Sequence, residues 1–95
     1  MSFKILQIKN KISILGQFSG QDVGQLTEAI ERIVQGPITI DLSKISFIDS
    51  SGLGVLIYNW KNLKEKSREM TLTQPNDVVY EIFKNSNLDK ILRIK

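Results

Sequence analysis

The sequence predicts an α/β fold in which one mixed β-sheet of four to five strands packs against three to four helices. Short β-branched and apolar runs alternate with longer segments of helical periodicity, in the order β, β, α, β, α, β, α, β. Glycine, proline or asparagine separates most of these segments. A length of 95 residues with 41% hydrophobic content suits one small domain, residues 1–95.

The chain opens with a predicted β-hairpin. Apolar and polar residues alternate loosely over residues 3–8, and a similar pattern resumes over residues 11–15, so we expect two strands joined at Lys9 and Asn10. Gly16, together with Ser19 and Gly20, should end the second strand.

A first helix is predicted from Asp22 to about Gln35. Asp22 and Gln25 have the spacing of an N-terminal capping box, and Gly36 followed by Pro37 stops the helix. Its inward stripe should consist of apolar residues at helical spacing, namely Val23, Leu26, Ile30, Ile33 and Val34.

The middle of the chain predicts a buried strand followed by an amphipathic helix. Residues 38–42 are short, apolar and β-branched, which is typical of a central strand that runs parallel to a neighbour. The helix should span about Ser51 to Lys66. Its apolar stripe contains Leu53, Leu56, Ile57, Trp60 and Leu63.

The last third predicts a strand, a helix and a final strand. Residues 70–73 form the strand, and Pro75 with Asn76 opens the helix. Asn87 should end the helix in a left-handed conformation, before a short strand near residues 91–94. The apolar residues of this helix are Val78, Val79, Ile82 and Phe83.

Composition removes several classes of function. The chain has no Cys and no His, which excludes disulfides, thiol nucleophiles, Cys or His metal sites and an imidazole base. Thirteen basic residues against ten acidic ones are scattered along the chain, so we expect no direct nucleic-acid binding. No stretch approaches the roughly 20 apolar residues of a membrane span. We therefore expect a cytoplasmic protein without membrane insertion, enzymatic activity, metal or cofactor.

One segment departs from routine core patterning. Asp49-Ser50-Ser51-Gly52-Leu53-Gly54 places an acid, two hydroxyls and two glycines between a strand end and a helix start. A helix N-terminus attracts anions, so a hydroxyl there is well placed to carry a phosphoryl group. A simpler interpretation is that Asp49 or Ser50 caps the helix, while Gly52 and Gly54 allow close packing on the sheet. Both interpretations stay open on the residues alone.

Catalytic interpretations of the same segment are weaker. Ser51 lacks the Gly-x-Ser-x-Gly elbow, and the chain has no His to act as base. Asp41 and Asp49 are a lone pair of carboxylates, which is common in any protein. Gly52-Leu53-Gly54 lacks the third glycine or the Lys-Ser/Thr ending of a phosphate-binding loop.

The stretch from Ile40-Asp41-Leu42-Ser43 through Phe47-Ile48-Asp49-Ser50-Ser51-Gly52-Leu53-Gly54-Val55-Leu56 resembles the signature of the STAS domain, and the resemblance extends over nearly the whole chain. This family comprises bacterial anti-sigma-factor antagonists and the cytoplasmic domains of sulfate transporters. The resemblance implies that Ser51 is the phosphorylated residue. It also implies that the unphosphorylated protein binds an anti-sigma factor that is a serine/threonine kinase, thereby freeing a sigma factor, and that a serine phosphatase resets the switch.

Two local departures from the family accompany this resemblance. Many antagonists carry Gly-Glu-x-Asp after the second strand, where this chain has Gly16-Gln17-Phe18-Ser19, so the partner contacts of those acids are not implied here. Ser67-Arg68 and Asn87 stand where the family often has glycine, which affects only turn geometry.

A partner surface is predicted beside Ser51. Val55, Tyr58 and Asn59 fall on the side of the helix away from its apolar stripe, as a docking surface requires. The complete predicted set is Asp49, Ser50, Ser51, Gly52, Val55, Tyr58, Asn59 and Ser19. An alternative function is a STAS subunit that docks in a larger signalling or transporter assembly without Ser phosphorylation. A small basic nucleic-acid binder is a third and weaker hypothesis.

Overall fold

The structure, a computed structural model, describes residues 3–95, which form five strands and three α-helices. It confirms the predicted α/β class and the mixed sheet. In chain order the elements are β1 (Phe3–Ile8), β2 (Lys11–Phe18), the 3₁₀ helix η1 (Gln21–Gly24), α1 (Gln25–Glu31), β3 (Ile38–Ile48), α2 (Ser50–Glu65), β4 (Met70–Thr73), α3 (Asp77–Asn85), the 3₁₀ helix η2 (Leu88–Lys90) and β5 (Arg93–Ile94).

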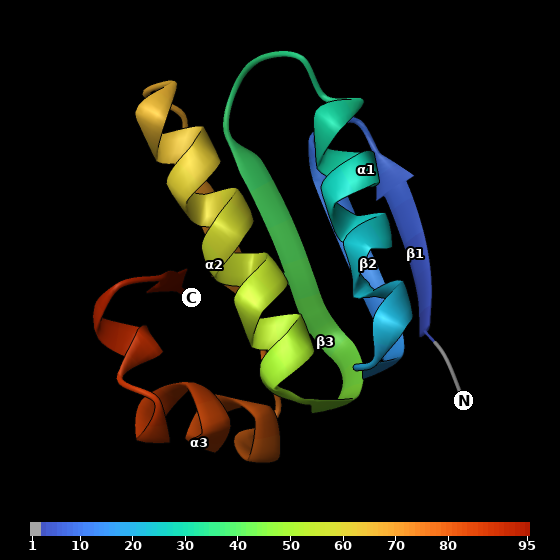
Figure 1. Cartoon of the computed structure of the whole chain (residues 1–95), viewed down its shortest axis with the longest axis vertical. Helices are drawn as coiled ribbons and strands as arrows, with labels where there is room; N and C mark the ends of the chain where they lie inside the picture. The colour runs from blue at the N-terminus through green and yellow to red at the C-terminus, as the bar shows by residue number, and fades with distance from the viewer. Residues whose placement is uncertain (1–2) are drawn as a thin grey trace.

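The sheet has the strand order β1-β2-β3-β4-β5. β1 pairs antiparallel with β2, and every later pair is parallel, which confirms β3 as a central parallel strand. Because successive parallel strands are added in one direction, right-handed crossovers bring α1 and α2 to the same face of the sheet. Figure 1 shows the two helices side by side in front of the strands.

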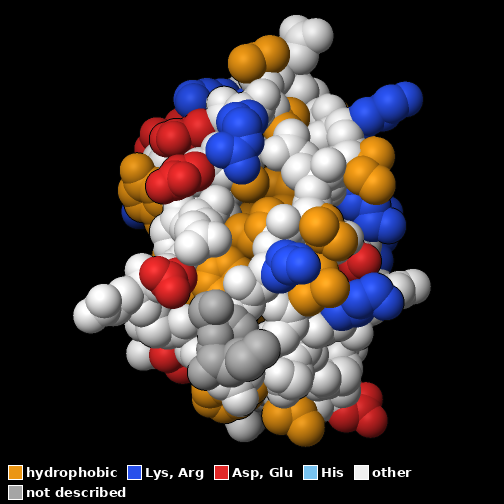
Figure 2. All heavy atoms as spheres, turned by 90° about the vertical axis from the view of Figure 1, so that its right-hand side faces the viewer, with side chains coloured by type: hydrophobic (Ala, Val, Ile, Leu, Met, Phe, Trp, Pro, Cys, Tyr) orange, Lys and Arg blue, Asp and Glu red, His pale blue; other side chains and the backbone are white. Residues whose placement is uncertain are grey.

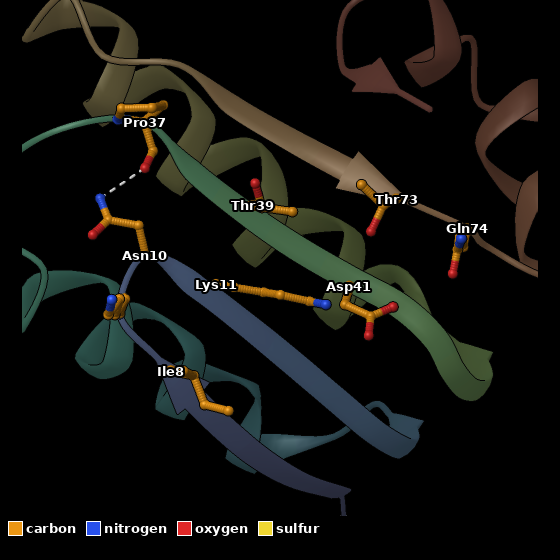
Figure 3. A pocket seen from close by; sticks show the side chains of 9 residues that line it. Ile8, Asn10, Lys11, Pro37, Thr39, Asp41, Thr73 and Gln74 are labelled. Atoms are coloured by element: carbon orange, nitrogen blue, oxygen red, sulfur yellow. Dashed lines mark hydrogen bonds between the residues drawn. The ribbon is translucent and has the colours of Figure 1, made fainter.

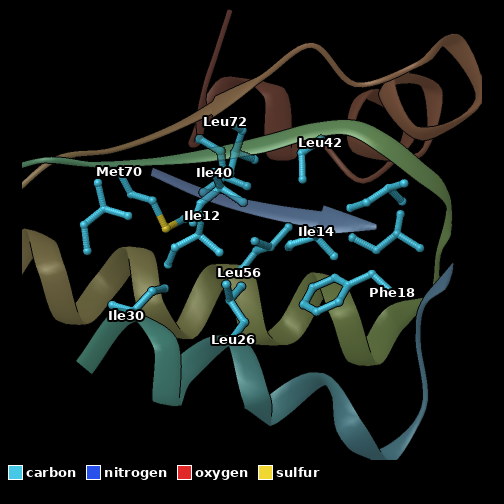
Figure 4. Close-up of a cluster of buried hydrophobic side chains, with 14 of the residues drawn as sticks. Ile12, Ile14, Phe18, Leu26, Ile30, Ile40, Leu42, Leu56, Met70 and Leu72 are labelled. Atoms are coloured by element: carbon cyan, nitrogen blue, oxygen red, sulfur yellow. The ribbon is translucent and has the colours of Figure 1, made fainter. Parts of the chain in front are cut away.

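The core lies between this face of the sheet and the two helices (Figure 4). Alternate residues of β2, of β4 and of the first half of β3 point toward the helices, because successive side chains of a strand alternate between its faces. At one edge the Phe18 ring packs edge-to-face on Phe3, with the ring centroids 5.0 Å apart. The fully buried residues in contact here include Ile12, Ile14, Ile40, Leu42, Leu72, Leu26 and Leu56.

The second and third strands are longer than the sequence predicts. β2 continues through Gly16 to Phe18, and β3 continues past Leu42 to Ile48. Gly16 has φ of 93° and lies at an irregularity in the β2–β3 register, so it marks a bulge rather than a strand end. Because the two strands stay paired with each other, both continue through polar positions that the sequence analysis interpreted as loops.

The first helix is shorter than predicted, and its predicted cap is wrong. η1 precedes α1, the N-cap position of η1 is Gly20, and Asp22 makes no capping hydrogen bond. α1 ends at Glu31, and Val34, which was expected to face the core, is 84% exposed.

Tertiary hydrogen bonds explain why the helix stops early. The Arg68 guanidinium donates to the carbonyl oxygens of Ile33 (3.0 Å) and Gly36 (2.9 Å), and the Asn10 amide donates to that of Gln35 (3.0 Å). These donors hold residues 32–37 as a loop, and their positions could not be inferred from local periodicity.

The third helix begins as predicted. The Asn76 Oδ1 atom accepts a hydrogen bond from the Val79 N–H (2.8 Å), and its Nδ2 donates to the Ile45 carbonyl (3.0 Å), so one side chain both caps α3 and ties it to β3. Asn87 takes the predicted left-handed conformation with φ of 60°. Val78, by contrast, is 60% exposed and does not belong to the apolar face.

The last strand is shorter than predicted. It is confined to Arg93–Ile94, because η2 occupies Leu88–Lys90 shortly before it. Among the residues described, no helix has the length and apolar character needed to cross a bilayer.

Candidate functional site

The segment that the sequence singled out lies where β3 ends and α2 begins, at the lower end of the molecule in Figure 1. Asp49 is the N-cap of α2, and its Oδ1 accepts a hydrogen bond from the Gly52 N–H (3.0 Å). Its Oδ2 accepts a second one from the Gly20 N–H (3.3 Å). Asp49 therefore caps the helix, as the simpler interpretation predicted, and also ties the loop after β2 to the start of α2.

The two glycines of the motif have different structural roles. A Cβ atom on Gly52 would lie 2.4 Å from the Phe18 carbonyl oxygen and 2.8 Å from the Ile48 Cγ1 atom. The predicted close packing is therefore confirmed for Gly52. For Gly54 it is wrong, because a Cβ atom there would meet nothing within 4 Å.

Ser50 and Ser51 are exposed at the first turn of α2. The first N–H groups of a helix have no carbonyl partner within the helix, and together they carry roughly half a positive elementary charge. The Ser51 hydroxyl thus combines solvent access with a local field that favours an anion, which is the chemistry that a phosphate acceptor needs.

An exposed strip continues from Ser51 along α2. Tyr58 follows seven residues later, about two helical turns, and is 56% exposed, as expected for a docking residue. Gly54 lies between them and is also exposed. We call Ser50, Ser51, Gly54 and Tyr58 the α2 strip.

Asn59 does not belong to this strip, so its expected exposure is wrong. Its side chain is 2% exposed, and its Nδ2 donates to the Thr27 hydroxyl and to the Val55 carbonyl, both at 2.9 Å. Val55 is half-buried and packs against the core. Because α1 lies along this side of α2, the helix is covered on two sides rather than one.

The residues of the apolar stripe of α2 differ in how deeply they are buried. Leu56 and Leu63 are buried in the core, whereas Leu53, Ile57 and Trp60 are only partly buried. This stripe confirms that α2 packs through the residues that its periodicity indicated.

The remaining predicted residue, Ser19, lies next to the motif. It is half-buried, and the neighbouring Gly20 donates to Asp49. Phe47, which the sequence analysis did not single out, precedes Asp49 by two residues and is 43% exposed. In strict strand alternation Phe47 would share a face with the buried Ile45, so no local signal in the sequence marked it. Its exposure follows from the register irregularity between β2 and β3 at this point.

Asp41 belongs to a different part of the molecule. It lines a hollow of about 510 Å³ on the sheet face turned away from α1 and α2, together with Lys11, Thr39 and Thr73 (Figure 3). Asp41 accepts hydrogen bonds from Ser43 and Ser13, whereas Asp49 accepts from Gly20 and Gly52. The two carboxylates therefore have separate partners. Within residues 3–95, no group of three or more metal-ligating side chains comes together.

Asp41 gives the protein a pH-dependent contribution to stability. Burial alone would raise the pKa of Asp41. Hydrogen bonds from Ser43 and Ser13 and the charge of Lys11 together lower it by more, so the pKa lies below the ordinary value of 3.8. The contribution is fully present above 3.8 and is lost as the pH falls through the lower folded-state pKa. We expect Asp41→Asn to lose less stability on acidification than the wild type in urea titrations at several pH values. Parallel pH profiles for the two proteins would contradict this.

Comparison with known proteins places this geometry in context. The STAS domain family model matches residues 5–95. The anti-sigma-B factor antagonist of Listeria monocytogenes is 30% identical over 87 residues, covering 88% of this chain and 76% of that protein. The anti-sigma F factor antagonist of Paenibacillus polymyxa is 37% identical over 70 residues, covering 74% of this chain and 60% of that protein.

A relative from another system also matches. The intermembrane phospholipid transport system binding protein MlaB of Escherichia coli is 31% identical over 87 residues, which cover 92% of this chain and 90% of that protein. Among solved structures, the unphosphorylated anti-sigma factor antagonist SpoIIAA superposes with a TM-score of 0.68 at 19% identity, covering 99% of this chain and 87% of that chain, and so shares the fold. With the family model matched over residues 5–95, the chain belongs to the STAS domain family.

Proposed function

We propose that this protein is an anti-sigma-factor antagonist, a binding protein without enzymatic activity. In its unphosphorylated form it binds an anti-sigma factor that is also a serine kinase, and so frees a sigma factor in the cytoplasm. Residues 1–95 act as one STAS domain in this proposal. Two relatives named as antagonists support it, as does the exposed Ser51 hydroxyl at the N-terminus of α2.

Phosphorylation of Ser51 supplies the switch in this proposal. A phosphate adds about −1.5 to −2 charges at neutral pH. The free protein accommodates that charge at the helix N-terminus, in contact with solvent. A partner packed over the same turn would bury a dianion close to the Asp49 carboxylate, which lies two residues away. Phosphorylation therefore weakens the complex more than it affects the free protein, and a phosphatase restores binding.

The α2 strip, with Ser19 beside it, is the proposed partner surface. Glycine inside an exposed helix costs roughly 1 kcal/mol relative to alanine. Among residues 3–95, no packing neighbour accounts for Gly54, because a Cβ atom there would meet nothing within 4 Å. A partner that approaches the backbone closely between Ser51 and Tyr58 gives this glycine a role. The exposed Tyr58 ring then supplies the apolar and hydrogen-bonding anchor that such interfaces favour.

Substitutions at Ser51 test the proposal. We expect Ser51→Ala to bind the anti-sigma factor like the wild type, and Ser51→Asp to bind about 100-fold more weakly, which corresponds to roughly 2.7 kcal/mol. The measurement is affinity capture from native cytoplasm with all three proteins, followed by mass spectrometry and titration of the captured kinase. Ser86→Asp adds the same charge at the exposed C-cap of α3 and should bind normally. Equal binding by wild type and Ser51→Asp would refute phosphorylation control.

The second candidate is a STAS subunit that docks in a larger assembly without phosphorylation, and the similarity to MlaB over most of both chains favours it. Under this alternative, Ser51→Asp keeps its partner, whereas Tyr58→Ala loses it. The same capture experiment therefore separates the two candidates, and the identity of the retained partner assigns the assembly.

A further inference from the structure

Two neighbouring loops form the end of the molecule opposite Ser51. The turn between β1 and β2 and the loop of residues 32–37 both lie at the top of Figure 1, whereas α2 begins at the bottom. Asn10 fastens them together, because its Nδ2 donates to the carbonyl oxygens of Gln35 (3.0 Å) and Pro37 (2.8 Å). The Thr39 N–H donates in turn to the Asn10 carbonyl (3.0 Å). The two loops therefore have a fixed relative position.

An aliphatic side chain is exposed to solvent at each of these loops: Ile8 is the last residue of β1, next to the turn, and Val34 lies within the loop of residues 32–37. Val34 is 84% exposed and Ile8 is 74% exposed, the two highest values for large hydrophobic residues in the part of the chain that is described. They come from segments 26 residues apart in sequence and are brought to one end by the Asn10 hydrogen bonds. The fold itself does not use these side chains, since neither belongs to the core.

Basic residues surround the two aliphatic side chains. Lys9, Lys11 and Arg32 are all exposed. Two acids lie near them: Glu31 precedes Arg32 in the chain, and Asp41 faces Lys11 across the hollow of Figure 3. We call Ile8, Lys9, Lys11, Arg32 and Val34 the cationic tip. Figure 2 shows orange hydrophobic and blue basic side chains near one another at this upper end, with red acidic side chains beside them on the left.

Other charges at the same end leave this excess in place. Arg68 donates to two backbone carbonyls and so is held inside the fold, and Glu69 pairs with Arg93 at 2.9 Å. Lys66 and Glu65, at the end of α2, contribute one charge of each sign. With Lys9, Lys11 and Arg32 set against Glu31 and Asp41, and with Arg68 also cationic, the net charge of the end is positive.

We propose that the cationic tip docks on the surface of an anionic phospholipid membrane. Aliphatic side chains that protrude from a strand end and a loop need no preformed pocket in order to enter the boundary between headgroups and acyl chains, whereas a protein partner would need cavities of matching spacing. The neighbouring Lys and Arg side chains complement lipid phosphates, each raising the binding constant about fivefold near an anionic leaflet. Ser51 would remain accessible on the far side of the molecule.

Vesicle sedimentation tests this inference independently of the proposed function, because it requires neither the kinase nor phosphorylation. The purified full chain is mixed with vesicles of equal parts phosphatidylcholine and phosphatidylglycerol, and separately with phosphatidylcholine alone. We expect sedimentation with the anionic vesicles, and its loss at high salt. Lys9→Glu combined with Arg32→Glu should reduce the binding constant more than 25-fold, roughly fivefold for each cation removed and further for the added repulsion.

Matched variants on α3 serve as controls. Ile8→Ser with Val34→Ser removes both aliphatic side chains and should also abolish sedimentation, while Val78→Ser and Lys84→Glu change an exposed aliphatic and an exposed basic residue elsewhere. Thermal unfolding of each variant verifies that it is folded. Absence of sedimentation with anionic vesicles would overturn the proposal, and so would equal losses in the tip and α3 variants. Binding of an acidic protein at the tip, without vesicle binding, would assign the surface to that partner instead.

Discussion

Replacing Gly52 by alanine is expected to lower the free energy of unfolding by about 3 kcal/mol, the upper part of the range for inserting a methyl group into a well-packed site. The added Cβ atom would lie 2.4 Å from the Phe18 carbonyl oxygen, so either α2 or the end of β2 must move. Movement would also strain the hydrogen bond from the Gly52 N–H to Asp49. The higher helix propensity of alanine offsets only about 1 kcal/mol. Urea unfolding followed by circular dichroism measures the effect.

Gly54→Ala is the matched control for this substitution. It makes the same chemical change two residues along the same helix, where a Cβ atom meets no neighbour within 4 Å. We expect a gain in stability of about 0.5 to 1 kcal/mol. Equal unfolding midpoints for the two variants would show that the contact between Gly52 and Phe18 relaxes freely. Under the proposed function, Gly54→Ala should also weaken partner binding despite its greater stability, because the methyl group projects into the docking surface.

Asn59→Asp is the second substitution with a large expected effect, a loss of about 3 kcal/mol of stability at neutral pH. The side chain keeps its size, but a carboxylate would replace the amide that donates to the Val55 carbonyl and the Thr27 hydroxyl. At 2% exposure, little water reaches the site to solvate the new charge. The loss should shrink on acidification, since protonation neutralises the carboxylate and restores a donor.

Asn62→Asp provides the comparison, because Asn62 lies one turn further along α2 and is only partly buried. Its effect should stay within about 0.5 kcal/mol, as for most surface substitutions. A large loss for Asn62→Asp as well would mean that negative charge on α2 is unfavourable in general. In that case burial of Asn59 would not be the cause.

The element order, the central parallel strand and the start of α2 could all be predicted from the sequence, because each depends on local signals. Asn76 capped α3 as its residue type indicated, and Asp49 capped α2. The motif of residues 49–54 was found in the same way, since polar residues and glycines between a strand and a helix stand out from core patterning.

Features that depend on contacts distant in sequence could not be predicted. The early end of α1 results from hydrogen bonds donated by Asn10 and Arg68, which lie more than twenty residues away on either side. Asn59 was expected on an exposed face because one apolar stripe suggested a helix covered on one side, whereas α1 covers a second side. Gly52 and Gly54 look alike in the sequence, and only the position of Phe18 distinguishes them.

The agreement between strand order and chain order has a consequence for synthesis on the ribosome. Each strand from β2 to β5 pairs with the strand that was synthesised immediately before it. A new strand therefore finds its pairing partner already made. The sheet can therefore grow in step with translation, from the N-terminal hairpin onward. At each stage the newest strand presents a bare edge, and for β3, eleven residues long, that edge persists until α2 and then β4 have been made. The nascent chain is consequently most vulnerable to misassociation during synthesis of α2.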